Sequence, residues 1–209
     1  MATHVVVVGS GFGGIASALR ARKLGFEVTL IERLDQLGGR ARTFERDGHK
    51  FDAGPTVITA PFLFEELFEL FDRQLPEYAE MLPVSPWYRY EFNDGSRLDY
   101  GGSVEDTLKE IERLSPDDVD GYRKLLSHSK KIFDVGFSEL AHVPFNRLWF
   151  MIKQVPALIR LGCYRTVWQF TKRYLKDDRL RRAFSIQPLL VGGNPFNTTS
   201  IYSLIHYLE

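Results

Sequence analysis

The stretch Val5-Val6-Val7-Val8-Gly9-Ser10-Gly11-Phe12-Gly13-Gly14 decides the fold of the first part of this chain. Its four valines form an apolar run long enough for a buried parallel strand. The run leads directly into the pattern G-x-G-x-x-G. A helix pattern follows, Gly25 stands where a helix C-cap is expected, and an apolar strand is predicted over residues 26–31. These features together predict a βαβ unit.

Each part of this unit suits the binding of a pyrophosphate. Gly9 allows a tight turn, Gly11 lets the backbone approach the ligand, and Gly14 lets helix and strand pack closely. The helix N-terminus offers unpaired N–H groups to the anion. Glu32 lies 18 residues past Gly14, where an acid accepts a hydrogen bond from a ribose 2′-hydroxyl and disfavours NADP. The predicted dinucleotide-binding residues of this unit are Gly9, Ser10, Gly11, Phe12, Gly13, Gly14 and Glu32. The alternative is a glycine-rich turn that holds no ligand.

A second glycine cluster follows soon after Glu32, in Arg33 and the run Gly38-Gly39-Arg40. Two residues without Cβ allow another close backbone approach to phosphate, and the Arg40 guanidinium can neutralise it. Alone, this run is equally typical of a basic surface turn. Its position just after Glu32 favours the phosphate-binding interpretation.

Length and composition indicate a globular protein of one large or two small domains. The chain has 209 residues with 44% hydrophobic and 26% charged residues, which is typical of soluble domains. No run approaches the ~18 apolar residues of a membrane span. The first strand begins too early for a signal peptide to precede it. Cys163 is the single cysteine, which excludes an internal disulfide and suits a cytoplasmic location.

The formal net charge of zero hides a strongly basic segment at residues 143–184. It contains 10 Lys and Arg but only Asp177 and Asp178 as acids, so its net charge is 10 − 2 = +8. Its basic residues alternate with the aromatic residues Phe145, Trp149, Phe150, Tyr164, Trp168, Phe170, Tyr174 and Phe184. This mixture favours peripheral contact with a membrane surface that carries anionic headgroups. The alternatives are a solvated basic face over an aromatic core, or nucleic acid, for which no motif is present.

Periodicity predicts the remaining elements. Two β-hairpins are expected at residues 43–52, with an Asp-Gly turn, and at residues 88–100. Helices are expected at 61–73, from 103, from 115, over most of 144–183 and from about 198. The stripe Phe64, Leu67, Phe68 and Phe71 is predicted to be core rather than a ligand site. Asp117, Asp118 and Asp120 lack EF-hand spacing, so helix-start electrostatics is the favoured interpretation.

The sequence lacks the usual hydrolytic and metal-binding motifs. It has no G-x-S-x-G, no H-E-x-x-H, and its five histidines show no Cys/His ligand spacing. We therefore predict no metal site, and no catalytic acid or base can be assigned. An enzyme that relies on a bound cofactor for its redox chemistry would fit this pattern.

The motifs at 9–14, 32, 38–40 and 51–59 resemble those of the flavoprotein amine-oxidase and carotenoid-desaturase superfamily. The stretches 189–196 and 200–206 agree, and the resemblance is strongest to bacterial phytoene desaturases. It covers the whole chain but only the N-terminal portion of a family member. It implies FAD rather than NAD, and it places Gly54, Pro55, Thr56 and Val57 near the isoalloxazine. It also adds Arg33, Gly38, Gly39 and Arg40 to the cofactor site. Without it, residues 52–56 indicate only a strand that ends in a Gly-Pro turn.

The resemblance implies an α/β fold with two parts. Residues 1–82 would form a Rossmann-like FAD-binding domain, and residues 83–209 a partial substrate-binding domain with a helical, membrane-facing region. The implied activity is FAD-dependent phytoene desaturation, in which a hydride passes to the flavin and the adjacent carbon loses a proton. The implied partners are an apolar carotenoid, a membrane surface, and a quinone or dioxygen as electron acceptor. No nucleic acid is expected.

Three alternatives stay open at this point. Two are other activities within the same superfamily, namely carotenoid isomerisation and dehydrogenation of a later carotenoid. The third is a non-catalytic nucleotide-binding remnant rather than part of an enzyme, because the sequence ends at Glu209 where family members are expected to continue. The DNA downstream of codon 209 would distinguish a remnant from part of an enzyme.

Overall fold

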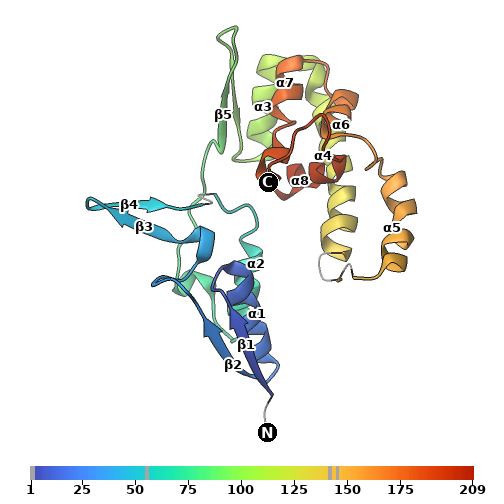
Figure 1. The fold of residues 1–209 in the computed structure, drawn as a ribbon. Helices are drawn as coiled ribbons and strands as arrows, with labels where there is room; N and C mark the ends of the chain where they lie inside the picture. The colour runs from blue at the N-terminus through green and yellow to red at the C-terminus, as the bar shows by residue number, and fades with distance from the viewer. Residues whose placement is uncertain (1–2, 55–56, 141–142, 145) are drawn as a thin grey trace. The chain divides into compact units, whose positions relative to one another are not determined.

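The computed structural model of the protein describes residues 3–54, 57–140, 143–144 and 146–209 (Figure 1). The chain forms two compact units, residues 1–82 (unit 1) and residues 83–209 (unit 2).

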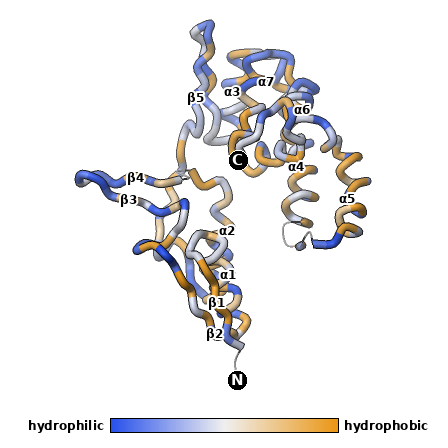
Figure 2. The backbone as a smooth tube through the Cα atoms, viewed as in Figure 1, coloured by the Kyte–Doolittle hydropathy of each residue, from blue (hydrophilic) through white to orange (hydrophobic). Residues whose placement is uncertain are grey.

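Unit 1 begins with the predicted βαβ arrangement. Strand β1 (His4–Val8) pairs in parallel with β2 (Glu27–Ile31), and helix α1 (Phe12–Lys23) connects them. The helix ends as predicted, because Gly25 has a φ of 89°, in the left-handed region. The expectation of a fully buried strand is wrong. Val6 and Val8 are 51% and 81% exposed, because α1 packs on one face of the sheet while the other face lies open to solvent. Figure 2 shows this uncovered strand as strongly apolar.

A hairpin and a short helix complete unit 1. Strands β3 (Thr43–Arg46) and β4 (His49–Asp52) pair as predicted, and positive φ values at Asp47 and Gly48 give the expected tight turn. Short 3₁₀ turns occupy η1 (Gly39–Ala41) and η2 (Leu75–Glu77).

Helix α2 (Phe62–Glu69) is shorter than the predicted helix at 61–73. Asp72 adopts a left-handed φ of 54°, and the Arg73 N–H donates to the Phe68 carbonyl at 3.1 Å. This closure ends the helix one turn early, which periodicity alone does not predict.

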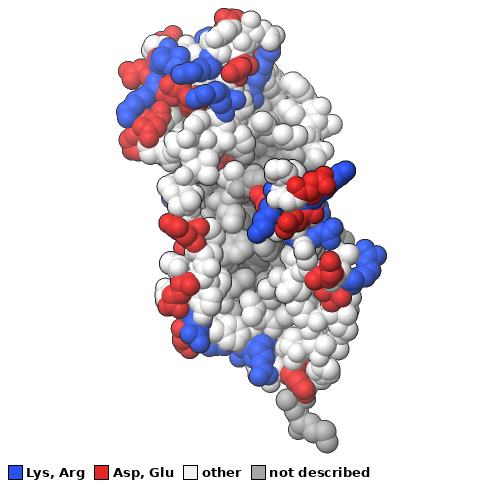
Figure 3. Space-filling view, turned by 90° about the vertical axis from the view of Figure 1, so that its left-hand side faces the viewer, with Lys and Arg blue, Asp and Glu red and all other residues white. Residues whose placement is uncertain are grey.

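Unit 2 combines a β-hairpin with a set of helices around one core. Strand β5 (Tyr88–Glu91) pairs antiparallel with β6 (Arg97–Tyr100), as predicted. The helical elements are α3 (Val104–Leu114), η3 (Pro116–Asp118), α4 (Val119–Phe133), η4 (Asp134–Glu139), α5 (Leu148–Arg160), α6 (Val167–Tyr174), α7 (Asp178–Ala183), η5 (Gln187–Val191), η6 (Ser200–Leu204) and α8 (Ile205–Leu208). The core includes Leu98, Ile111, Leu125, Phe170 and Phe184. Figure 3 shows acidic and basic side chains intermixed at one end of this unit.

The aromatic residues of the basic segment divide between two environments. Phe170 and Phe184 are buried in the core of unit 2, as the alternative of an aromatic core under a basic face predicts for them. Trp149 and Tyr164 are each 67% exposed. The expected position of Phe145 lies outside the described residues.

Asp118 joins the start of α4 to the connection between α6 and α7. Its fully buried carboxylate accepts hydrogen bonds from the backbone N–H groups of Lys176 at 2.6 Å and Asp177 at 2.8 Å, and from the Ser115 hydroxyl at 3.0 Å. Gly121 lies one turn later, where an added Cβ would clash with the Tyr174 carbonyl. Asp118 therefore has a tertiary role, and the helix-start interpretation missed it.

We expect Asp118→Ala to lower the free energy of unfolding of unit 2 by about 2–4 kcal/mol, because two backbone donors and the Ser115 hydroxyl lose their acceptor. All three tryptophans lie in unit 2, so their fluorescence during urea unfolding reports on this unit. Asp117→Ala, at the exposed neighbouring acid, is the matched control and should change stability by less than about 1 kcal/mol. Equal losses of unfolding free energy in the two variants would contradict the tertiary role of Asp118.

Candidate dinucleotide-binding site

The turn after β1 has the geometry that close approach of a phosphate requires. Gly9 has a φ of 95°, and its N–H donates to the Ile31 carbonyl at 2.7 Å, which joins the ends of the two strands. At Gly14, a Cβ would clash with the Gly9 carbonyl, so helix and strand pack as closely as predicted. Around Gly11 the space that a Cβ would occupy has no protein atom within 4 Å. The backbone here is open to a ligand at the N-terminus of α1.

Glu32 is held against this turn by three hydrogen bonds. One carboxylate oxygen accepts from the Ser10 N–H at 2.8 Å and from the Ser10 hydroxyl at 2.7 Å. The other accepts from the Leu34 N–H at 2.9 Å. These bonds, with that from the Ser10 hydroxyl the largest, lower the pKa of Glu32 to about 2. The group is therefore an ionised acceptor at neutral pH.

The bonding of Glu32 leaves capacity for a ligand. A carboxylate can accept about four hydrogen bonds, and three are in use here. The oxygen that accepts from Leu34 can take one more donor, such as a ribose hydroxyl. The fixed negative charge would repel a 2′-phosphate.

The second glycine cluster lies directly against the first. The Gly38 N–H donates to the Ser10 carbonyl at 2.9 Å, and Gly11 and Gly38 form a parallel bridge. A Cβ on Gly39 would lie 3.0 Å from the Cα of Gly11. Gly38 and Gly39 have φ values of 104° and 58°, which favour glycine. Two runs more than twenty residues apart in sequence thus share one backbone surface.

The third predicted segment reaches the same place through Gly54. A Cβ on Gly54 would clash with the Arg40 carbonyl, and the Ala53 N–H donates to the Arg42 carbonyl at 3.0 Å. The side chains of Arg33 and Arg40 are exposed and so remain able to reach a phosphate. Pro55 and Thr56 lie outside the described residues.

Val57 lines an apolar pocket of about 840 Å³ in unit 1. The pocket runs between α1 and α2, and its walls include Phe12, Leu19, Phe64, Phe68 and Tyr78. Phe12 meets Phe64 edge to face, with ring centroids 5.1 Å apart. The stripe Phe64, Leu67, Phe68 and Phe71 was predicted to be core, yet it lines this open pocket. Its first three residues are half-buried, and Phe71, beyond the end of α2, is exposed.

Sequence reasoning missed how Ser10 and Glu32 act together. Ser10 was predicted only as a member of the glycine loop, whereas both its N–H and its hydroxyl orient the acid. A serine after the first glycine, together with an acid at the end of the next strand, is a signal that could have revealed this pair.

Comparison with known proteins agrees with this geometry. Residues 7–74 match the NAD(P)-binding Rossmann-like domain family. The chain is 46% identical over 203 residues to a lycopene-forming phytoene desaturase of Pantoea ananas, a match that covers 97% of this chain and 41% of that protein. It is 42% identical over 208 residues to the corresponding enzyme of a Paracoccus species, covering 100% of this chain and 42% of the relative.

The chain is homologous to an N-terminal portion of the phytoene desaturases. It spans about two fifths of the length of these relatives. A more distant relative is the 4,4'-diapolycopen-4-al dehydrogenase of Metabacillus indicus, which is 32% identical over 207 residues, covering 98% of this chain and 42% of that protein.

Solved structures support the same fold. A putrescine oxidase with putrescine bound is similar with a TM-score of 0.57 and 20% identity, over 98% of this chain and 41% of that one. At this identity the likeness shows the fold alone. It agrees with the predicted Rossmann-like α/β class.

Two kinds of feature are absent from the described residues. Across residues 3–54, 57–140, 143–144 and 146–209, no helix is long and apolar enough to cross a membrane. Within the same ranges, no three His, Cys, Asp or Glu side chains gather where they could hold a metal ion.

The hydrogen bonds of Glu32 predict a specific pH dependence. Because the folded pKa is depressed, the stability that this carboxylate contributes is present above its unfolded pKa near 4.5 and is lost as pH falls through about 2. We expect the Ser10 amide resonance to titrate with a midpoint near pH 2 in an NMR experiment, and Glu32→Gln to abolish that titration. A midpoint near 4.5 would show that the Ser10–Glu32 bonds are absent in solution.

Proposed function

We propose that residues 1–82 bind FAD and that the chain is part of a phytoene desaturase. The observation that carries this proposal is the convergence of three glycine segments, at 9–14, 38–39 and 54, beside the ionised Glu32. Phytoene desaturase relatives at 42–46% identity support the choice of reaction.

The residues present fit an FAD molecule. The open side of Gly11 and the N–H groups at the start of α1 would hold the pyrophosphate, while Glu32 would accept a ribose hydroxyl. Gly38, Gly39 and Arg40 would bind from the other side, and the segment Gly54 to Val57 would lie nearest the isoalloxazine. When bound, the flavin supplies the hydride acceptor for desaturation.

The chain's own contribution is binding and orientation. A carotenoid offers almost no hydrogen-bonding groups, so its recognition depends on apolar surface and shape. We assign no catalytic acid or base among these residues. The proposed acceptor of the resulting electrons is a quinone or dioxygen.

The nearest alternative is an enzyme that acts later on carotenoids, because a relative at 32% identity is a carotenoid aldehyde dehydrogenase. A completed protein expressed with a phytoene source would distinguish the two. Coloured desaturated products from phytoene support phytoene desaturation. The alternative is supported if phytoene stays unconverted and a later carotenoid, supplied in a separate assay, is converted.

We also propose peripheral association of unit 2 with a membrane surface. An insoluble substrate of the kind that the relatives' names describe has to be taken from a lipid phase. Exposed Trp149 and Tyr164 in the basic segment support contact with such a phase.

The cofactor site is tested by Gly11→Val and Glu32→Ala in a completed protein. Gly11→Val should abolish flavin binding, because a branched side chain would occupy the place of the pyrophosphate. Glu32→Ala should weaken FAD affinity on the order of tenfold to a hundredfold through a lost hydrogen bond. Flavin absorbance measures the flavin content of each variant, and quenching of flavin fluorescence measures its FAD affinity. Glu45→Ala, at an exposed position of β3, is the control and should keep full flavin content.

Residues 1–209 alone should bind no flavin stably and desaturate nothing, because the relatives are more than twice as long and unit 1 exposes apolar strand residues such as Val8. Expression followed by size-exclusion chromatography and flavin absorbance checks this. A monomeric yellow protein that makes coloured carotenoid from phytoene would overturn the expectation.

A further inference from the structure

Helix α5 presents an apolar stripe to solvent. Leu148, Ile152, Val155 and Ile159 follow the spacing i, i+4, i+7, i+11 and therefore share one face. All four are exposed, with Leu148 at 73%. Figure 2 shows α5 as a largely hydrophobic helix. A stripe of this kind on an exposed helix indicates a surface that is covered in the working protein.

The orientation of α5 is fixed by its other face. Leu158 and Leu161 pack against the core of unit 2. His128 on α4 donates a hydrogen bond from Nε2 to the Leu161 carbonyl at 3.0 Å and accepts one at Nδ1 from the Tyr174 hydroxyl at 2.6 Å. Burial lowers the pKa of His128, which suits the neutral ring that this arrangement requires. The stripe therefore points outward because its inward face is already used.

The charge beside the stripe has one sign. Between Glu139 and Asp177 the sequence contains seven Lys and Arg residues and no acid. On α5, Lys153 and Arg160 border the stripe in line with Trp149, and the Lys153 ammonium lies 6.0 Å from the Trp149 ring centroid. Nearby, the Arg165 guanidinium lies 4.7 Å from the exposed Tyr164 ring. Among the described residues, none of these cations forms an ion pair.

The end of the basic segment is different, because two of its cations are already paired. Arg179 pairs with Asp177 and Asp94, and Arg182 pairs with Asp178. Lys172, Arg173, Lys176 and Arg181 also form no ion pair among the described residues, but they lie on or between α6 and α7, whose apolar residues Val167, Phe170 and Leu180 are buried. Helix α5 differs because it combines unpaired cations with exposed apolar residues.

We propose that α5 is an in-plane anchor that binds an anionic lipid bilayer. This inference rests on the proposed peripheral membrane association and identifies the element, the face and the headgroup charge. The 13 residues of α5 span about 20 Å, shorter than the ~30 Å hydrocarbon core, so the helix lies in the interface. The aliphatic stripe enters the acyl boundary, Trp149 lies at headgroup level, and Lys153 and Arg160 meet lipid phosphates. A protein partner is disfavoured because the border of the stripe carries cations only, which is the sign that anionic headgroups attract.

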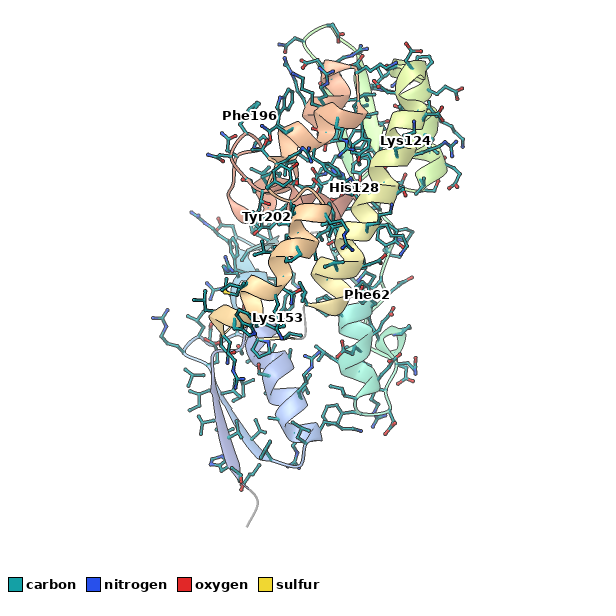
Figure 4. All side chains as sticks on the ribbon, turned by 90° about the vertical axis from the view of Figure 1, so that its right-hand side faces the viewer. Phe62, Lys124, His128, Lys153, Phe196 and Tyr202 are labelled. Atoms are coloured by element: carbon teal, nitrogen blue, oxygen red, sulfur yellow. The ribbon has the colours of Figure 1, made fainter. Side chains whose placement is uncertain are left out.

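Vesicle flotation tests the charge requirement. The full chain, fused to maltose-binding protein to keep it dispersed, is mixed with vesicles of phosphatidylcholine alone or with phosphatidylglycerol. We expect binding only to the anionic vesicles, weakening with salt. Lys153→Glu/Arg160→Glu should lower affinity about thirty-fold or more. Arg123→Glu/Lys124→Glu changes the net charge equally on α4 and should alter affinity less than about twofold. Figure 4 shows Lys124 on α4, toward the opposite end of unit 2 from Lys153.

A second pair of variants tests the stripe. Ile152→Ser/Ile159→Ser should reduce affinity at least about tenfold by removing apolar side chains from the acyl boundary. Leu24→Ser/Leu82→Ser, at similarly exposed apolar positions in unit 1, should have little effect. Equal binding to neutral vesicles, no response to charge reversal at 153 and 160, or no binding at all would overturn the proposal. So would a dimer that Ile152→Ser/Ile159→Ser converts to a monomer while lipid binding persists. Because the assay contains no flavin or carotenoid, its failure is separable from failure of the cofactor assignment.

Discussion

Unit 1 depends on contacts in which backbone meets backbone with no room for a side chain. At Gly14 and Gly54 an added Cβ would clash with the Gly9 and Arg40 carbonyls, and at Gly39 it would press on Gly11. Backbone atoms cannot rotate away as a long side chain can, so these positions set the distances between the segments. The open side of Gly11 and the position of Glu32 follow from them. The proposed ligand surface is consequently formed mainly by main chain, and its shape is insensitive to rotamer changes.

The local features of this unit could be predicted because their signals are short-range. A strand, a glycine turn, a helix and a second strand follow one another within thirty residues, and the Asp47-Gly48 turn needs only its two residues. The burial of the strands could not be predicted in the same way. An apolar run indicates what a strand prefers to contact, but the second covering layer depends on other segments of a protein. In unit 1, Val6 and Val8 are apolar strand residues, but no second layer covers them and they are exposed.

The basic segment shows where pattern reasoning loses information. Its composition predicts aromatic and cationic residues near a surface. It does not show which side of each helix faces the core. Turns near Gly162 and Asp177 interrupt the helical periodicity, so each helix orients its side chains independently. Phe170 and Phe184 point into the core, while Trp149 and Tyr164 are exposed. Asp118 holds the second of these turns through hydrogen bonds to backbone N–H groups almost sixty residues further along the chain. A contact at such separation leaves no periodic signal.

The two exposed apolar surfaces differ in a way that bears on what covers them. The open face of the β1–β2 sheet carries aliphatic residues on paired parallel strands, and such sheets are normally covered on both faces by protein. On α5, by contrast, the apolar stripe is bordered by unpaired cations with no acid in the surrounding sequence. Protein layers bury aliphatic faces irrespective of net charge, whereas an anionic interface selects for one sign. Apolar area alone would give both surfaces the same interpretation. The unpaired cations that border the stripe of α5 favour lipid there, whereas a parallel sheet is of the kind that further polypeptide covers.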